Sequence, residues 1–383
     1  MKIVISPDAF KGSLKASELC FLIEKVLKRK WPNAEILSLP LADGGEGTME
    51  TLVRATGGYY EKVNVQDPLN RNIGASYGVL GDKKTAVIEV AEASGLPLVT
   101  EEEKNPYYTN TYGTGELVKA ALDKGFRRFI VGLGGSATND VGVGFLQALG
   151  YQFYDSIGEQ VPLGGKHLEQ IEMIDESKVD KRLKDCQFLV ASDVKNPLCG
   201  MNGATRVFGT QKGATSSMIK ELERGVLHFA FIMERHTSIK VTEKAGLGAA
   251  GGLAAALQTF LQAKIVSGIE LVMEEVKYSE LIEGASFIIT GEGAIDKQTF
   301  QGKVIKGVCE QAAIKNIPVV AICGQLHLSQ RELEELGLVT AFSIIKKAGT
   351  LAETIGDTQE RLLDLIERMV ALSDFFHTNY SRK

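Results

Sequence analysis

The feature that most constrains the fold is a repeated unit, found at both ends of the chain: a short apolar run, a polar loop and a helical pattern. Near the N-terminus, the runs "KIVIS" and "AEILSLPLA" are each followed by such a loop and by apolar residues at helical spacing. The runs "ASFIITGEG", "IPVVAICGQ" and "LVTAFSIIK" repeat the pattern near the C-terminus. Strands that are apolar on both faces and alternate with helices indicate a parallel sheet covered on both sides.

These two groups of strands predict one sheet built from both ends of the chain, because two strands and three strands together make a sheet of typical size. In the middle, "YEKVNVQ", "ASYGVL" and "TAVIEVA" have the spacing of hairpins, which indicates antiparallel strands. The expected fold class is therefore α/β with two α/β domains. The first is a discontinuous Rossmann- or flavodoxin-like parallel sheet with helices on both faces, residues 1–60 and 281–383; the second is a mixed α/β domain inserted into it, residues 61–280.

The composition excludes several classes of protein. The chain has 383 residues, 44% of them hydrophobic, which is enough for two packed domains. A formal net charge of −5 gives no basic field for nucleic acid or an anionic membrane. No apolar run reaches the ~18 residues of a membrane span, and the N-terminal run lacks a signal-peptide cleavage signature, so we expect a cytoplasmic protein. Five cysteines without a C-x-x-C pair favour reduced thiols over a disulfide framework or a zinc site.

The stretch "VGLGGSATND" follows a strand-like run and precedes a helical one. Glycines let the backbone approach an anion, and N–H groups at a helix start can bind phosphate together with nearby hydroxyl groups. A tight turn that packs a strand against a helix is the structural alternative, but the hydroxyl groups favour phosphate. The candidate phosphate ligands are Gly134, Gly135, Ser136, Thr138 and Asn139.

Two glycine patterns, "GLGAAGG" and "GLGGSA", match the fingerprint of dinucleotide-binding folds. The first follows a polar stretch instead of a strand, and neither is followed by a convincing ribose-binding acid. A close helix contact built from small residues is the better interpretation of "GLGAAGG". The pattern G-x-x-x-x-G-K-[ST] is absent, which argues against a P-loop kinase.

Polar residues follow another strand-like run in "ASDVKNPLCG", at a place where open α/β sheets bind ligands. Asp193 is a candidate to accept a hydroxyl proton, and Lys195 is a candidate to offset phosphate charge. Asn196 could hold a substrate or a metal ion. An Asx-type turn is the structural alternative, and the position at a strand end favours function.

The stretch "ITGEGAIDKQTFQGK" also follows a strand-like run. Its two carboxylates, Glu292 and Asp296, suit Mg²⁺, which takes few protein carboxylates and keeps phosphate oxygens as ligands. Lys303 suits nucleotide phosphates. A solvated loop in which Asp296 caps the next turn is the alternative. Charge clusters at several strand ends are what a phosphoryl transfer needs, so the chemistry indicates a phosphotransferase outside the P-loop class.

Two acidic turns follow the N-terminal runs. "SPDAFKGS" contributes Asp8 and Lys11, with capping of the next helix by Ser13 as a nearly equal alternative. "LPLADGGEGTME" places Asp43 and Glu46 among glycines that permit close approach. No cation lies beside these two acids in the stretch, so we expect them to accept hydrogen bonds from substrate hydroxyl groups or to reach Mg²⁺. Stabilisation of the following helix start is the alternative for Glu46.

Seven blocks together resemble the type 1 glycerate kinase family, also called the glycerate 2-kinase family. They occur in order from residue 6 to residue 303: "SPDAFKGSLKASE", "PLADGGEGT", "VIEVAEASGL", "GLGGSATNDVGVG", "ASDVKNPLCG", "GAAGGL" and "ITGEGAIDKQTFQGK". The third block adds Glu89 as a candidate substrate ligand. The resemblance implies a two-domain α/β fold with a discontinuous first domain, in agreement with the strand pattern.

The resemblance also implies ATP-dependent, Mg²⁺-dependent phosphorylation of D-glycerate in the cytoplasm, feeding lower glycolysis from glyoxylate or sugar acids. The usual product of bacterial members is 2-phosphoglycerate, with 3-phosphoglycerate as the alternative. The resemblance does not identify the catalytic base. Our own hypothesis is that Lys11 or Lys195 meets the glycerate carboxylate, that Asp193 orients or deprotonates the attacking hydroxyl, and that the two domains face each other across a cleft.

Two other interpretations compete with the kinase: a nicotinamide-dependent dehydrogenase of small hydroxy acids, and a non-catalytic sensor of a sugar acid or nucleotide. We expect small molecules as partners, with no nucleic acid and no membrane, and a homo-oligomer is left open.

Overall fold

The structure is a computed structural model that describes residues 1–380 except 11, 302 and 346–356, and leaves out the side chains of residues 301 and 376–380. Its contacts divide the chain into two compact units, Met1–Asp43 with Ile269–Lys383, and Gly44–Gly268. These limits differ from the expected ones near residues 60 and 280. The reason at the first limit is that helix α2 (Thr48–Thr56) packs on strands of the second unit. That each unit is a domain stays a prediction.

The first unit contains a five-stranded sheet in the order β13-β12-β11-β1-β2, and every neighbouring pair is parallel. This confirms the predicted sheet made from both ends of the chain. In sequence order the strands are β1 (Lys2–Pro7), β2 (Glu35–Ser38), β11 (Phe287–Ile295), β12 (Val319–Leu326) and β13 (Thr340–Ser343). The direction of the strand order reverses between β1 and β11, which makes that pair the switch point at which such sheets bind ligands.

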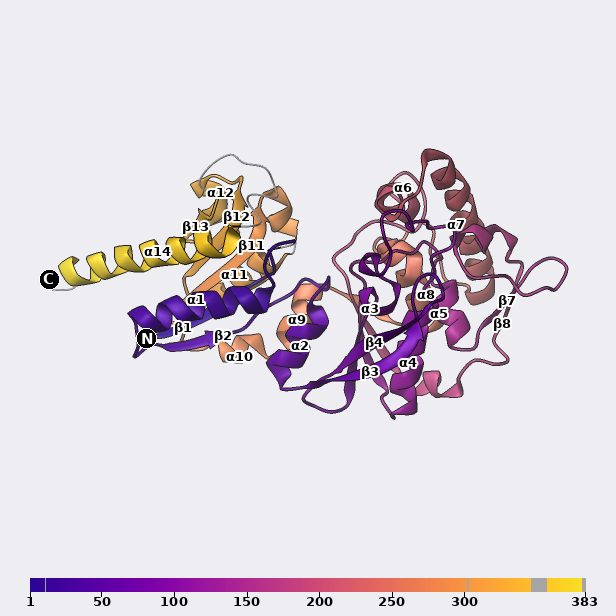
Figure 1. The fold of residues 1–383 in the computed structure, drawn as a ribbon, viewed down its shortest axis with the longest axis horizontal. Coiled ribbons are helices and arrows are strands. Elements are labelled where there is room, and N and C mark those ends of the chain that lie inside the picture. The colour runs from indigo at the N-terminus through magenta and orange to yellow at the C-terminus, as the bar shows by residue number, and fades with distance from the viewer. Residues whose placement is uncertain (11, 302, 346–356, 381–383) are drawn as a thin grey trace. The chain divides into compact units, whose positions relative to one another are not determined.

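Helices cover both faces of this sheet. Helices α1 (Ala16–Lys30) and α14 (Thr358–Tyr380) lie side by side in Figure 1 and share one core with Ile3 and Ile5 of β1. Helix α11 (Val304–Ile314) packs on β11 and β12 outside that core, so it covers the other face. The remaining helical segments of the unit are α9 (Gly268–Glu275), α10 (Tyr278–Leu281), η6 (Lys297–Gln301) and α12 (Gln330–Leu336).

The second unit contains a six-stranded mixed sheet in the order β10-β9-β6-β5-β4-β3. Strands β10, β9, β6 and β5 are parallel, whereas β5, β4 and β3 are antiparallel, which confirms the predicted hairpins. The strands are β3 (Tyr59–Gln66), β4 (Asn72–Val79), β5 (Thr85–Glu89), β6 (Arg128–Gly132), β9 (Gln187–Ala191) and β10 (Lys264–Val266), with β7 (Gln152–Tyr154) and β8 (Met173–Asp175) forming a separate pair.

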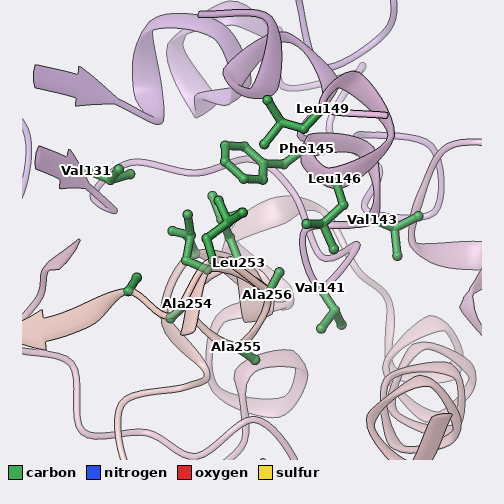
Figure 2. Close-up of a cluster of buried hydrophobic side chains, with 14 of the residues drawn as sticks. Val131, Val141, Val143, Phe145, Leu146, Leu149, Leu253, Ala254, Ala255 and Ala256 are labelled. Atoms are coloured by element: carbon green, nitrogen blue, oxygen red, sulfur yellow. The ribbon is translucent and has the colours of Figure 1, made fainter. Parts of the chain in front are cut away.

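The core of the second unit lies beneath the loop that follows β6. Figure 2 shows Val131 of β6 with Phe145 and Leu146 of α5 (Val143–Ala148) and Leu253 of α8 (Leu253–Phe260). This packing anchors both ends of the loop between β6 and α5. The other helical segments are α3 (Ala91–Ser94), η1 (Leu96–Leu98), α4 (Tyr112–Asp123), η2 (Gly165–Gln170), η3 (Lys181–Asp185), α6 (Ala204–Phe208), η4 (Thr210–Lys212), α7 (Ser216–Thr237) and η5 (Ala249–Gly252).

Among the described residues, no helix has both the length and the apolar character needed to cross a membrane.

Candidate active site

The switch point of the first sheet brings together acidic and basic residues that are far apart in the sequence. Asp8 directly follows β1, and its backbone N–H donates a 2.8 Å hydrogen bond to the carbonyl oxygen of Gly291 in β11. Glu292 is the next residue of β11, and its Oε2 lies 3.6 Å from Nζ of Lys303. Its Oε1 accepts a 3.3 Å hydrogen bond from the backbone N–H of Ile305, near the start of α11. The carboxyl end of the central strands therefore holds a buried carboxylate beside a lysine.

Burial dominates the electrostatics of Glu292. Loss of solvent raises the pKa of its carboxyl group to about 7, and the charge of Asp43 raises it further. Lys303 and the N–H of Ile305 act in the opposite direction, because both favour the charged carboxylate. Asp43 and Glu292 thus form a pair of repelling carboxylates, and a cation would relieve that repulsion.

The structure does not place two other predicted residues of this unit, Lys11 and Asp296, with Asp43 and Glu292. Lys11 lies outside the described residues. Asp296 follows β11, and its Oδ1 accepts a 2.7 Å hydrogen bond from the backbone N–H of Gln298, as a turn-capping residue does. In the described part of the chain, no group of three or more His, Cys, Asp and Glu side chains is arranged to hold a metal ion.

In the second unit, the acidic glycine turn lies against the glycine loop that follows β6. A Cβ atom at Gly134 would lie 2.7 Å from Cα of Gly45 and 2.8 Å from the backbone nitrogen of Glu46. A Cβ atom at Gly44 would lie 2.9 Å from the carbonyl carbon of Ala191, the last residue of β9. These approaches are possible only without side chains, so the glycines bring three sequence blocks to one end of the sheet.

Glu89, the last residue of β5, lies at the same end of the sheet. Its Oε1 accepts a 2.7 Å hydrogen bond from the backbone N–H of Met49, at the start of α2. Burial raises the pKa of the Glu89 carboxyl group to about 7, and the charges of Glu92 and Glu46 raise it further. The Glu89 carboxyl group, which lies close to Glu46, therefore has a pKa near neutral pH.

The predicted phosphate ligands of the loop differ in their surroundings. Ser136 accepts a 2.9 Å hydrogen bond from Nζ of Lys212, which also donates a 2.7 Å bond to the carbonyl oxygen of Thr138. The hydroxyl group of Thr138 is buried and has no hydrogen-bond partner among the described residues. Asn139 is buried as well, and its amide donates to the hydroxyl group of Thr205 at 3.0 Å.

Lys212 was not predicted from the sequence. It lies in "GTQKGA", a turn that carries no recognisable chemical motif, and it is 76 residues from Ser136 along the chain. The glycines on either side were the one available signal, and they indicate a turn instead of a site.

The predicted residues after β9 have different surroundings. Oδ1 of Asp193 accepts a 3.3 Å hydrogen bond from the backbone N–H of Gly268, and Lys195 is exposed. The amide of Asn196 donates to the carbonyl oxygen of Asn202 at 2.9 Å. Asp193 lies just beyond the carboxyl end of β9, beside the strand whose loop contains Ser136.

The "GLGAAGG" stretch is a packing element, which confirms the structural interpretation of this pattern. A Cβ atom at Gly251 would lie 2.0 Å from the carbonyl oxygen of Thr138, and the carbonyl oxygen of Gly251 accepts a 3.1 Å bond from the N–H of Val141. The small residues that follow, Ala254 to Ala256, lie in the buried cluster of Figure 2. The stretch supports the glycine loop from below.

Comparison with known proteins decides the class of this site. The sequence model that defines the glycerate kinase family matches residues 3–374 of this chain. The chain belongs to the glycerate kinase family. Its members are phosphotransferases, so the predicted enzyme class is confirmed, and the dehydrogenase and sensor interpretations are dropped.

Curated relatives and a solved structure agree with this family assignment. A protein of Escherichia coli named glycerate 2-kinase is 46% identical over 353 residues, covering 92% of this chain and 93% of its own. A glycerate kinase of Halalkalibacterium halodurans is 45% identical, covering 97% of both chains. A crystal structure from Salmonella typhimurium, assigned as glycerate kinase 2, has a TM-score of 0.86 at 43% identity and covers 99% of both chains.

Proposed function

We propose that this chain transfers the terminal phosphoryl group of ATP to D-glycerate, giving 2-phosphoglycerate and ADP. The observation that carries the proposal is the 46% identity, over 92% of the chain, to the relative named glycerate 2-kinase. A cytoplasmic location and a role in feeding glycolysis stay predictions. The alternative product is 3-phosphoglycerate.

The carboxylates of the first unit fit a magnesium ion. Mg²⁺ is usually bound through one or two protein carboxylates together with substrate phosphates, so the lack of a larger acidic cluster among the described residues does not conflict with it. Asp43 and Glu292 are the carboxylates we assign to it, because the charge of Mg²⁺ would offset their mutual repulsion. Mg²⁺ bound with ATP neutralises charge on the phosphate oxygens. Lys303, beside Glu292, would bind a phosphate oxygen.

In the second unit, Ser136 and the N–H groups of Gly134 and Gly135 would bind an anionic oxygen. Glu46 and Glu89 would accept hydrogen bonds from hydroxyl groups of glycerate, since both lie near the carboxyl end of the same sheet. Asp193 would take the proton of the attacking hydroxyl group. That oxygen forms the new bond to phosphorus, and the bond between this phosphorus and the ADP oxygen breaks.

One experiment tests both the reaction and the position of transfer. The purified protein is incubated with ATP, MgCl₂ and D-glycerate, and the products are identified by phosphorus NMR with proton coupling. We expect ADP and a phosphorus signal coupled to one methine proton, as in 2-phosphoglycerate. Coupling to two methylene protons would assign the 3-phosphate instead, and unchanged ATP would reject the kinase proposal.

The role of Asp193 is tested by Asp193→Asn, which keeps the shape of the side chain. Loss of a general base typically lowers the rate by about 10²–10⁴-fold, so we expect kcat to fall by that order with little change in KM. Asp185→Asn, at an exposed position in the same unit, is the matched control and should leave kcat unchanged. A near-normal kcat for Asp193→Asn would exclude the proton-accepting role.

A further inference from the structure

Lys212 is a buried lysine beneath the glycine loop of the second unit. It is the last residue of η4 and is 2% exposed. Its ammonium group donates hydrogen bonds of 2.9 Å to Oγ of Ser136 and 2.7 Å to the carbonyl oxygen of Thr138. Burying a lysine costs free energy unless its charge and its donors are used, so this position calls for a functional explanation.

The chemistry of the ammonium group determines the orientation of the Ser136 hydroxyl. An ammonium group has three donors and no acceptor, so the oxygen of Ser136 must accept from Lys212. The hydroxyl hydrogen of Ser136 is then directed elsewhere and can donate to another oxygen. In the described part of the chain, Lys212 is the hydrogen-bond partner found for that hydroxyl. Ser136 follows directly on Gly134 and Gly135, whose backbone can approach a ligand closely.

Lys212 forms no direct ion pair with any carboxylate of the described residues, because none of them lies within 4.0 Å of its Nζ atom. Asp140 is the charged residue that acts on Lys212 electrostatically. Its carboxylate is already engaged, however, and accepts hydrogen bonds from Thr111, Gly142 and Gly144. An anion at Ser136 would complete the balance of charge.

We propose that Lys212 is a positioning residue: it makes the Ser136 hydroxyl a hydrogen-bond donor to an anionic oxygen of the substrate and places a positive charge behind it. The ligand is a carboxylate or a phosphate group. The inference deepens the proposed function and rests on it for the identity of the ligands, D-glycerate or ATP. Binding itself can be measured without turnover.

The titration of Lys212 supplies a readout that a purely structural role would not change. Burial lowers the pKa of the ammonium group to about 7, and Asp140 acts in the opposite direction. The protonated form, which binds the anion, therefore prevails below pH 7 and is lost as the pH rises above it. The carboxylate of glycerate stays ionised throughout this range.

The test measures binding of D-glycerate, ADP and inorganic phosphate separately by titration calorimetry. Lys212→Met removes the charge and keeps an unbranched side chain of nearly the same length, and Ser136→Ala removes the donor. Each substitution should weaken the binding of one of these ligands by roughly ten- to a hundredfold, the range for a hydrogen bond to a charged group. The ligand whose affinity falls shows whether Ser136 binds a carboxylate or a phosphate group. Lys240→Met, which removes a lysine that is 89% exposed, is the control and should bind as the wild type does.

Two further measurements separate positioning from a structural effect. In the double variant, the fold loss of affinity should be much smaller than the product of the losses in the two single variants, because Lys212 acts through Ser136. Between pH 6 and pH 8.5 the affinity of the wild type should fall more steeply than that of Lys212→Met, in which only the ligand and other groups such as the Glu89 carboxyl group still titrate. Unchanged affinity in Lys212→Met, or independent effects of the two substitutions, would overturn the proposal.

The remaining outcomes are also decisive. If Lys212→Met does not fold, Ser136→Ala and the pH dependence of the wild type replace it, and a flat wild-type profile counts against the inference. If the wild type binds these anions in the expected manner but forms no phosphoglycerate, the proposed function fails and the role of Lys212 stands.

Discussion

At the scale of single residues, the site is shaped by buried polar groups that do not themselves face a ligand. Asp140 is fully buried, and its Oδ2 accepts hydrogen bonds from the backbone N–H of Thr111 at 2.9 Å, from its hydroxyl group at 2.8 Å, and from the N–H of Gly144 at 3.2 Å. Its Oδ1 accepts a 3.2 Å bond from Gly142. One carboxylate thus ties α4 to the loop that contains Ser136.

Replacing this carboxylate by an amide tests its structural role. Asp140→Asn keeps the shape but turns an NH₂ group towards N–H donors, and hydrogen bonds to charged groups contribute about 1.5–3 kcal/mol each. We expect the free energy of unfolding, measured with urea, to fall by roughly 3 kcal/mol or more. Asp155→Asn, in an exposed turn with similar local hydrogen bonds, is the control and should cost much less. Equal losses in the two variants would contradict this role.

At the scale of elements, close packing of η5 against the glycine loop between β6 and α5 fixes the position of that loop. Gly251 has a φ of +63° and touches the carbonyl group of Thr138, the same group that Lys212 binds. Gly142 is in contact with α8 from the loop side: a Cβ atom there would lie 2.6 Å from that of Ala256. A glycine pattern that resembles a nucleotide fingerprint therefore acts as a packing surface.

Gly251→Ala separates the contribution of contact from that of backbone strain. Its matched control is Gly57→Ala, since Gly57 has a φ of +67° and a Cβ atom there would have nothing within 4 Å. Both variants should lose about 1 kcal/mol from the left-handed backbone. Gly251→Ala should lose roughly a further 1–3 kcal/mol, the cost of overpacking, and should also weaken anion binding by displacing Thr138. If the two variants melted at the same temperature, the contact would have no energetic weight.

The C-terminal helix α14 is an integral part of the first unit. Leu362, Ile366 and Val370 are buried in the same core as Ile23 of α1. Ile366→Ala should lower the free energy of unfolding by about 3 kcal/mol, because it leaves a cavity in that core. Leu372→Ala, 53% exposed on the same helix, should change it by less than about 0.5 kcal/mol. A small effect at Ile366 would mean that α14 is only loosely attached.

At the scale of the whole molecule, each unit holds a buried glutamate near the carboxyl end of its sheet, Glu89 in the second unit and Glu292 in the first. The pKa values of Glu89 and Glu292 are both raised to about 7, mainly by burial. In the folded state each group therefore keeps a proton at pH values where it would release it in the unfolded state. Stability from this source is fully present below about pH 4.5 and is lost as the pH rises to about 7.

Glu89→Gln removes one of these titrations and still offers an oxygen to the N–H of Met49. The stability of this variant relative to the wild type should rise by about 3 kcal/mol between pH 4.5 and pH 7, as a pKa raised to about 7 requires. The measurement is urea unfolding at several pH values. Glu102→Gln, at an exposed position, should show no such trend. A constant difference between Glu89→Gln and the wild type would mean that Glu89 titrates normally.

Much of this organisation could be predicted from the sequence. Runs that are apolar on both faces predict the parallel sheet, because this pattern can be recognised from neighbouring residues alone and is typical of strands covered on both sides. Polar residues shortly after those runs, such as Asp193 after β9 and Ser136 after β6, could be placed near the ends of strands in the same way. The family resemblance, carried by seven ordered blocks, agrees with the family match over residues 3–374.

The tertiary structure alone decided which of these residues act on one another. Lys212 and Ser136 are 76 residues apart, and Asp43 and Glu292 come from opposite ends of the chain, so no local pattern could pair them. It also decided that α2 packs in the second unit and that "GLGAAGG" supports a loop. The physical reason is that hydrophobic periodicity is a property of neighbouring residues, whereas burial, pKa shifts and hydrogen-bond direction arise only from contacts made across the fold.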